Sequence, residues 1–277
     1  MKIVSRLEQS HGLDRLVRPG QKLARLIPPG KVRDALHGVW LGHPVHPLLV
    51  QVPVGAWLSA SVIGLRSEGE PAARTLSVIG LAGATPAALS GLADWSEQHE
   101  QQMRVGVVHW AANLLAIGCY ASSLVAARPA VSRTWRLAGL AALSVSGLLG
   151  GHMSFRLAGG ANHAEAVPHL IEPGWHWLMP EGELREDALV RAMVGEVPVV
   201  AIRRDGQVHV LADRCSHMSG SLAEGELSGA EVTCPWHGSV FCVRDGSVVG
   251  GPATAPQPSF ETRVIGGAVE VRLPGAG

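Results

Sequence analysis

Residues 215–237 read CSHMSGSLAEGELSGAEVTCPWH, and this stretch decides how the rest of the chain is interpreted. It places two of the chain's four cysteines, Cys215 and Cys234, shortly before the histidines His217 and His237. Thiolates and neutral imidazoles are the donors that bind zinc and iron in proteins. Because the Cys–His pairing occurs twice on short segments, we expect two loop tips that share one metal centre.

Three interpretations of these four donors compete. Structural zinc sites also use two Cys and two His, but they usually carry Cys-x₂₋₄-Cys knuckles, which Cys215-x-His217 does not match. Two buried cysteines with incidental histidines would not explain why a closely spaced Cys–His pair occurs twice. A Rieske centre holds one iron by two Cys and the other by two His. We favour the Rieske centre and expect no catalytic residue, but four metal ligands, namely Cys215, His217, Cys234 and His237.

A longer stretch, CSHMSGSLAEGELSGAEVTCPWHGSVF followed by DGSVVGGPATAPQP, resembles a Rieske domain of the ferredoxin-like kind over about residues 174–274. The resemblance implies one 2Fe-2S cluster per chain, with Cys215 and Cys234 on one iron and His217 and His237 on the other. It also implies that GGPATAPQP, residues 250–258, is the proline-rich loop that covers the cluster.

The same resemblance predicts a reduction potential in the lower part of the Rieske range, which runs from about −150 to +300 mV. High-potential members carry a disulfide between the cluster loops, but Ser219-Gly220 and Trp236 stand at those positions here. Ser239 keeps one hydroxyl donor to the cluster sulfur, whereas Phe241 replaces a tyrosine and loses the other. The missing disulfide also suits a reducing cytoplasm.

Short apolar runs around the motif predict an all-β domain. Residues 197–202 and 208–212 read as strands joined at Asp205-Gly206, which is a hairpin signal. Asp245-Gly246 and Gly266-Gly267 predict two further turns. Cys242 falls in a strand, and we expect a half-buried structural thiol there without assigning it a role.

The first half of the chain has a different composition. Four segments lack any charged residue and are each about 18–23 residues long, the length that a bilayer-spanning helix needs; they are residues 48–65, 75–93, 105–127 and 137–155. The pair Gly147/Gly151 has the GxxxG spacing that lets helices approach closely in lipid. A soluble bundle of buried helices is the alternative, but we expect a four-helix membrane domain.

Basic residues predict the orientation of these helices. Ten Lys and Arg residues lie on the side of the N-terminus and five on the other side. The positive-inside rule therefore predicts a multi-pass protein of the cell inner membrane, with its N-terminus and C-terminal domain in the cytoplasm.

Residues 13–27 alternate apolar and basic side chains, which fits an amphipathic helix on the anionic inner leaflet or a plain solvated helix. The formal net charge of zero gives no reason to expect nucleic-acid binding.

Five histidines should gather at the cytoplasmic face, namely His43, His46, His99, His109 and His152. One interpretation is a haem or another metal between His109 and His152, and the other is interfacial histidines that bond backbone carbonyls or headgroups.

Three blocks of the first half resemble an uncharacterised bacterial four-helix membrane family of unknown function, over about residues 38–165. The blocks are GVWLGHPVHPLLVQVPVGAWLSA, GLADWSEQHEQQMRVGVVHWAANLLA and GGHMSFRLAGGANHA. That resemblance implies a membrane location and no established chemistry.

Together these patterns predict a multidomain chain in which an α-helical four-span membrane bundle precedes an all-β Rieske-type domain. The expected parts are a basic N-terminal segment at 1–47, the bundle at 48–155, a linker at 156–173 and the Rieske domain at 174–277. We expect a membrane-anchored one-electron carrier whose partners are the lipid bilayer and unidentified electron donor and acceptor proteins. Alternatives are a membrane oxidoreductase with a haem or quinone in the bundle, or a redox or iron sensor.

The 40 residues after His237 contain no histidine, so a mononuclear iron site of a Rieske oxygenase is not expected there.

Overall fold

The computed structural model describes residues 2–274, which divide into two compact units. The first unit contains the residues up to Pro28 together with Pro44–Gly159. The second contains Pro29–His43 together with the residues from Gly160 onward. Pro29–His43, which the sequence pattern groups with the N-terminal segment, therefore belongs to the unit that carries the β domain.

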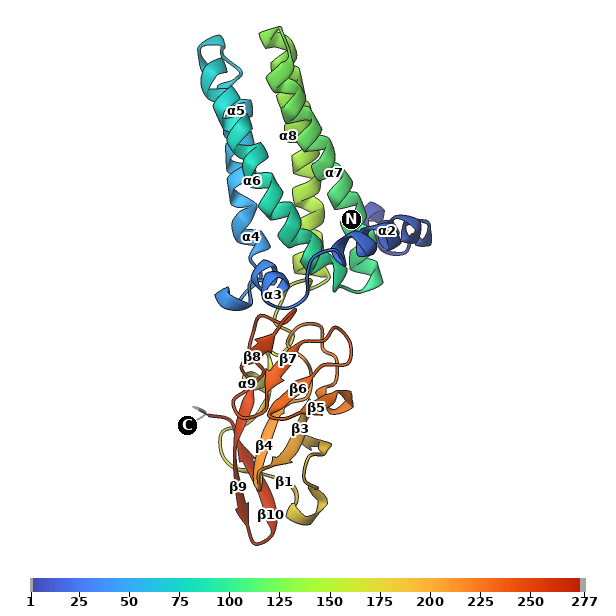
Figure 1. Cartoon of the computed structure of the whole chain (residues 1–277), viewed down its shortest axis with the longest axis vertical. Helices are drawn as coiled ribbons and strands as arrows, with labels where there is room; N and C mark the ends of the chain where they lie inside the picture. Colours follow the sequence, from blue (N-terminus) through green and yellow to red (C-terminus); the bar gives the residue numbers. More distant parts are fainter. Residues whose placement is uncertain (1, 275–277) are drawn as a thin grey trace. The chain divides into compact units, whose positions relative to one another are not determined.

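Four long helical segments form most of the first unit (Figure 1). All four are long and apolar enough to cross a membrane. The charge-free runs of the sequence are thus confirmed as helices. The elements are α4 (His46–Leu49) continued by α5 (Gln51–Ile63), α6 (Glu70–Ser96), α7 (Glu100–Val125), and α8 (Pro129–Gly151) continued by the π-helical turn η4 (His152–Arg156).

Close packing between these helices does not occur where the GxxxG spacing predicts it. A Cβ atom added to Gly147 would meet nothing within 4 Å. The close approach lies two turns earlier, at Gly139, where an added Cβ would be 2.8 Å from Cε2 of Tyr120. The Tyr120 ring stacks on Trp57 with ring centroids 4.7 Å apart, and its hydroxyl bonds the Ser61 hydroxyl at 2.8 Å. An aromatic pair with satisfied polar tips therefore forms the centre of the bundle.

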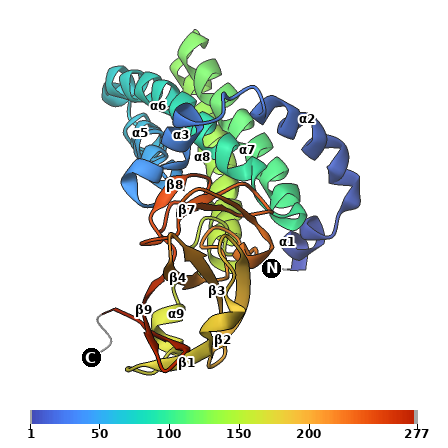
Figure 2. The ribbon, with the colours of Figure 1, turned by 60° about the horizontal axis from the view of Figure 1, so that its bottom comes forward.

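Two short helices precede the bundle, and both pack on it. They are α1 (Lys2–Glu8) and α2 (Asp14–Ala24), joined by a 3₁₀ turn, η1 (His11–Leu13). Helix α1 contacts α7, and α2 contacts both α6 and α7. Figure 2 shows both helices beside α7. The helix predicted for residues 13–27 is thus present, and one of its faces is covered.

The second unit is built from two antiparallel sheets. The larger has the order β1-β10-β9-β4-β3-β2, and its strands are β1 (His176–Pro180), β2 (Leu189–Val194), β3 (Val197–Arg204), β4 (Gln207–Ala212), β9 (Ser259–Ile265) and β10 (Ala268–Arg272). The smaller has the order β5-β6-β7-β8, with β5 (Glu226–Ser228), β6 (Glu231–Thr233), β7 (Val240–Cys242) and β8 (Val248–Gly250). Helices α3 (Lys31–His37) and α9 (Val167–Leu170) complete the unit, with 3₁₀ turns η2 (Val39–Leu41), η5 (Glu181–Glu183) and η6 (Leu222–Glu224).

The predicted hairpins are confirmed. Asp205 and Gly206 join β3 to β4 with φ angles of 53° and 72°, and Gly266 and Gly267 join β9 to β10 with φ angles of 60° and 80°. Positive φ at both central residues is the geometry of the tight hairpin turns that Asp-Gly and Gly-Gly favour.

Strand β3 lies between two hydrophobic cores. Val197, Val199 and Ala201 face one core, which also includes residues of β1 and β10. Val200 and Ile202 face the other, which includes Cys215 and Cys234. Because side chains alternate along a strand, one apolar run can serve both cores. The loops that carry the two cysteines thus share a core with one face of β3.

Candidate metal centre

The two cysteine-bearing loops share one backbone geometry. The first loop follows β4 and the second follows β6. In each, the cysteine amide donates to the carbonyl five residues later, and the cysteine carbonyl accepts from the amide four residues later. In the first loop the Cys215 amide donates to the Gly220 carbonyl at 2.8 Å, and the Ser219 amide donates to the Cys215 carbonyl at 2.8 Å. In the second loop the Cys234 amide donates to the Ser239 carbonyl at 2.8 Å, and the Gly238 amide donates to the Cys234 carbonyl at 3.1 Å. The residue four positions after each cysteine has positive φ, 65° at Ser219 and 76° at Gly238.

Backbone amides of the same loops point at the two sulfurs. The second and third residues after each cysteine donate to its Sγ, so His217 and Met218 bond Cys215, and Trp236 and His237 bond Cys234. Amide donors stabilise negative charge on a sulfur. Both loops are therefore shaped to hold a thiolate.

The four predicted ligands come together as one pair of sulfurs and one pair of rings. The Cys215 thiol hydrogen-bonds the Cys234 sulfur, which lowers the pKa of Cys234 to about 6 and raises the pKa of Cys215. The rings of His217 and His237 lie edge to face, with centroids 5.1 Å apart. Among residues 2–274, no three His, Cys, Asp or Glu side chains surround a position for a single ion. A pair of S donors beside a pair of N donors is the set that a binuclear iron–sulfur centre uses.

Burial separates the two pairs. Cys215 and Cys234 are 1% and 3% exposed and belong to the hydrophobic core, whereas both histidines are partly exposed. Trp236, next to His237, is 51% exposed. The sulfur side of the centre is therefore shielded from water, and the imidazole side reaches the surface.

The first loop meets the second so closely at Gly220 that no side chain fits there. An added Cβ would lie 2.9 Å from Cγ of Trp236 and 3.0 Å from Sγ of Cys234. This contact sets the spacing of the loops. Together with the donor set and the amides aimed at sulfur, it fits a 2Fe-2S cluster held by two Cys and two His.

A third loop, residues 251–258, is hydrogen-bonded to both cysteine loops. Ser216 donates from its amide to Oε1 of Gln257 at 3.0 Å and from its hydroxyl to the Ala255 carbonyl at 2.7 Å. The buried Gln257 amide donates in turn to the carbonyls of Ala212 and Arg214, each at 2.6 Å. These bonds hold the predicted cover loop beside the first cysteine loop.

Ser239 ties the cover loop to the second cysteine loop. Its hydroxyl oxygen accepts from the Ala253 amide at 3.0 Å, which leaves the hydroxyl proton available to another acceptor. Phe241 is fully buried in the adjoining core and brings no hydroxyl. Cys242 is partly buried, and its thiol bonds the Asp245 carboxylate, as suits the structural role expected for it.

Three residues that hold the loops, namely Asp213, Gln257 and Asp34, were not predicted from the sequence. The fully buried Asp213 accepts from the Ser221 hydroxyl, from the Ala223 amide at 2.7 Å and from Arg191 at 2.9 Å. Gln257 bonds the first cysteine loop, and Asp34 accepts from the Gly251 amide at the start of the cover loop. The signal that could have found Asp213 is its place, an acidic residue two positions before a ligand.

Histidines of the helical unit bond protein groups, and two of them, His46 and His109, bond backbone carbonyls as the second interpretation expects. Nδ1 of His109 lies 2.8 Å from the Ser146 carbonyl, and its Nε2 lies 3.0 Å from Nδ2 of Asn113. Nε2 of His152 lies 2.8 Å from Oε1 of Glu8. His46 similarly bonds the Ala87 carbonyl. Since these ring nitrogens already have protein partners, a haem between His109 and His152 is not supported.

Comparison with known proteins matches residues 174–261 to the Rieske [2Fe-2S] domain. The 3-phenylpropionate/cinnamic acid dioxygenase ferredoxin subunit of Escherichia coli (strain K12) is 38% identical over 101 residues, which cover 35% of this chain and 88% of that protein. The anthranilate 1,2-dioxygenase ferredoxin subunit of Burkholderia cepacia is 30% identical over 99 residues, covering 36% and 92%. The solved ferredoxin of carbazole 1,9a-dioxygenase from Nocardioides aromaticivorans IC177 is 23% identical over 36% of this chain and 97% of its own, with a TM-score of 0.35.

The matched residues 174–261 contain both cysteine loops, the cover loop and strands β1 to β8. Through residues 174–261, the chain belongs to the Rieske 2Fe-2S family, and an electron-transfer role follows from that membership.

Proposed function

We propose that the protein is a membrane-anchored one-electron carrier in which Cys215 and Cys234 hold one iron of a 2Fe-2S cluster and His217 and His237 hold the other. The observation that carries this proposal is the matched pair of loops, which brings two sulfurs together and two imidazoles together. When bound, the cluster supplies a site that takes up and releases a single electron. Two neutral imidazoles in place of thiolates remove negative charge, which is why Rieske potentials exceed the roughly −400 mV of plant-type ferredoxins.

Groups of the protein stabilise the reduced cluster and leave its histidine ligands partly exposed. The four amides that donate to the sulfurs stabilise the reduced state, because they offset the charge of the added electron. The partly exposed rings of His217 and His237 provide the route by which electrons leave, and Trp236 offers an exposed apolar contact beside them. The absent second hydroxyl, at Phe241, supports a potential in the lower part of the Rieske range.

The helical unit is proposed to anchor the carrier in the inner membrane. Four helices of sufficient length and apolarity, and the excess of basic residues on the N-terminal side, support a cytoplasmic N-terminus and a cytoplasmic Rieske domain. The proposed domains are the bundle at 48–155 and the Rieske domain at 174–277, with Pro29–His43 added to the latter. The relatives are ferredoxin subunits of dioxygenases, which supports redox proteins as donor and acceptor.

Iron, acid-labile sulfide and haem measurements on the detergent-purified full-length chain test this proposal, together with low-temperature electron paramagnetic resonance. We expect two irons and two sulfides per chain and the Rieske signal. Cys215→Ser should abolish the signal, whereas Cys242→Ser, a matched loss of a thiol in the same domain, should retain it. Zinc in place of iron, or a signal that survives Cys215→Ser, would overturn the ligand assignment.

A further inference from the structure

Helix α2 presents three different faces. At 3.6 residues per turn, Val17, Gly20 and Ala24 fall on one face, and all three are buried. A second face carries the exposed basic residues Arg15, Arg18 and Lys22, and Arg25, directly after the helix, continues it. The third carries Leu16 and Leu23, continued by Leu26 in the turn that follows the helix, and these are 56%, 44% and 76% exposed.

The buried face is held firmly to the bundle. A Cβ added to Gly20 would lie 2.6 Å from Cη2 of Trp95, so the helix backbone rests on this ring. Val17 packs with Met103 and Val107 of α7, and the Gln21 amide contacts the Met103 sulfur at 3.3 Å. The position of α2 against α6 and α7 is therefore fixed by packing, and its two other faces are left uncovered.

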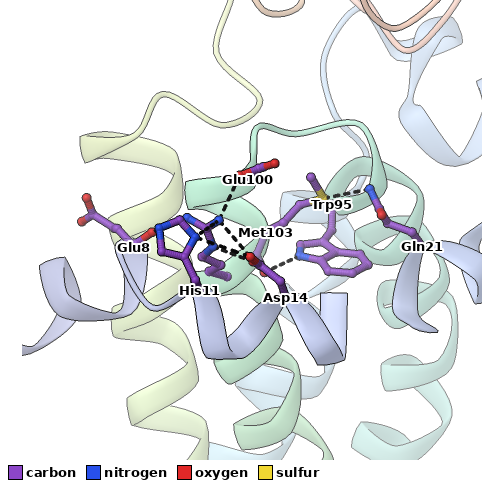
Figure 3. A network of polar contacts seen from close by, with 8 residues as sticks. Glu8, His11, Asp14, Gln21, Trp95, Glu100 and Met103 are labelled. Atoms are coloured by element: carbon purple, nitrogen blue, oxygen red, sulfur yellow. Dashed lines mark hydrogen bonds and ion pairs between the residues drawn. The ribbon is translucent and has the colours of Figure 1, made fainter. Parts of the chain in front are cut away.

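A buried arginine at the start of α7 fastens the beginning of α2. Arg104, 3% exposed, donates to Oδ1 of Asp14 at 2.7 Å and to Oε2 of Glu100 at 2.9 Å. It also contacts Nδ1 of His11 at 3.0 Å and the Glu8 carbonyl at 3.1 Å. Figure 3 shows His11, Asp14 and Glu100 converging on this point. Asp14, the only acidic residue of α2, is thus paired with Arg104, and the exposed charged side chains of the helix are all basic.

These contacts place α2 at the level where the long helices end. Trp95 lies in the last turn of α6, and Arg104 lies in the second turn of α7. Phe155, in the turn that ends α8, is 93% exposed, and η4 contacts α7. In the proposed membrane arrangement this level is the boundary between headgroups and hydrocarbon, where exposed leucine and aromatic side chains are covered by lipid.

From this geometry we infer that α2 lies in the surface of an anionic phospholipid leaflet. Leu16, Leu23 and Leu26 insert among the acyl chains, and Arg15, Arg18, Lys22 and Arg25 contact headgroup phosphates. Charge complementarity selects the lipid, because every charged side chain on the open faces is positive and basic residues near an anionic membrane are attracted to it. The inference rests on the proposed membrane location of the bundle.

Hydrogen–deuterium exchange of the full-length chain in lipid nanodiscs tests this placement. Discs of phosphatidylcholine alone are compared with discs that also contain phosphatidylglycerol. We expect amides of residues 14–26 to exchange about tenfold more slowly in the anionic discs, since lipid contact suppresses local opening. Arg18→Glu/Lys22→Glu should remove this difference. The control Arg185→Glu/Arg244→Glu, at exposed positions of the β domain, should leave it unchanged.

The outcomes distinguish the lipid contact of α2 from the proposed membrane anchor. Equal exchange of α2 in both lipids, with the four long helices protected in both, would overturn the inference and leave the membrane anchor standing. A chain whose long helices gain no protection in discs would overturn the anchor and the inference together.

Discussion

At the scale of single residues, Gly220 sets how closely the two cysteine loops approach. A methyl group there would press on the Trp236 ring and on Sγ of Cys234 at 3.0 Å, tighter than ordinary van der Waals contact. We therefore expect Gly220→Ala to push the loops apart and to lower cluster occupancy at least severalfold.

Iron and sulfide per purified chain, with the strength of the Rieske signal, measure this effect. Gly182→Ala is the matched control, because an added Cβ at Gly182 meets nothing within 4 Å. Wild-type iron content in Gly220→Ala would show that the spacing of the loops tolerates a methyl group and that Gly220 is not needed.

Ser239 bonds the cover loop, and we expect its hydroxyl to influence the redox potential as well. Its oxygen is the acceptor for the Ala253 amide, and a buried amide that loses its acceptor costs about 1–3 kcal/mol. Its free proton is the hydroxyl donor expected for a cluster sulfur. Ser239→Ala should therefore lower the unfolding temperature of the domain and also lower the midpoint potential.

A redox titration and a thermal melt of the same sample separate these two effects. Ser247→Ala, which removes an exposed hydroxyl bonded to Asp245, should change neither. If Ser239→Ala lowers the melting temperature while the midpoint stays at the wild-type value, the hydroxyl has only a structural role.

At the scale of secondary-structure elements, α3 acts on the cover loop. The Gly251 amide at the start of that loop donates to Oδ1 of Asp34 at 3.0 Å. An added Cβ at Gly251 would lie 3.1 Å from Cγ2 of Val39, so the segment after α3 also presses on the loop. A bond to a carboxylate contributes about 1.5–3 kcal/mol.

We therefore expect Asp34→Ala to loosen residues 251–258 and to raise amide exchange of the cover loop about tenfold. Asp34→Asn, which keeps an acceptor oxygen without the charge, should recover most of the protection. Exchange mass spectrometry of peptides from this loop measures both. Unchanged exchange in Asp34→Ala would mean that Ser216, Ser239 and Gln257 hold the loop without help from α3.

The elements that sequence predicted correctly are those fixed by local patterns. Charge-free runs gave the four long helices, and Asp205-Gly206 and Gly266-Gly267 gave two hairpins, because these features depend on neighbouring residues. The bond from Gly251 to Asp34 spans 217 positions and left no local trace. The helix contact at Gly139 instead of Gly147 depends on where the Tyr120 ring sits, which a spacing rule does not encode.

Among the site residues too, those marked by a local pattern were predicted, and those that act on distant parts of the chain were missed. The four donors were named from two closely spaced Cys–His pairs, and the structure brings them together as a pair of sulfurs and a pair of rings. Asp213 and Gln257 were missed because their role is to bond backbone groups of distant loops, a task that many polar residues perform. That five histidines gather at one membrane face stays a prediction. The structure shows that His109 and His152 bond protein partners, which the sequence did not reveal.

At the scale of the whole molecule, the chain crosses between its two units three times, after Pro28, after His43 and after Gly159. The sequence pattern had suggested one crossing, in the linker at 156–173. Pro29–His43 belongs to the same unit as the Rieske domain and directly precedes the first long helix, so in the proposed membrane arrangement we expect both on one side of the membrane. Together with the positive-inside rule, this grouping supports the proposal that the N-terminus, Pro29–His43 and the cluster lie in the cytoplasm.

Access of a membrane-impermeant reductant to the cluster tests this assignment. Dithionite added to inside-out vesicles should produce the signal of the reduced Rieske cluster without detergent, because the domain faces the outer solution. In right-side-out vesicles the same addition should give the signal only after detergent opens the membrane. A signal in sealed right-side-out vesicles would place the Rieske domain on the opposite side and would show that the basic residues of the N-terminal segment do not set the orientation.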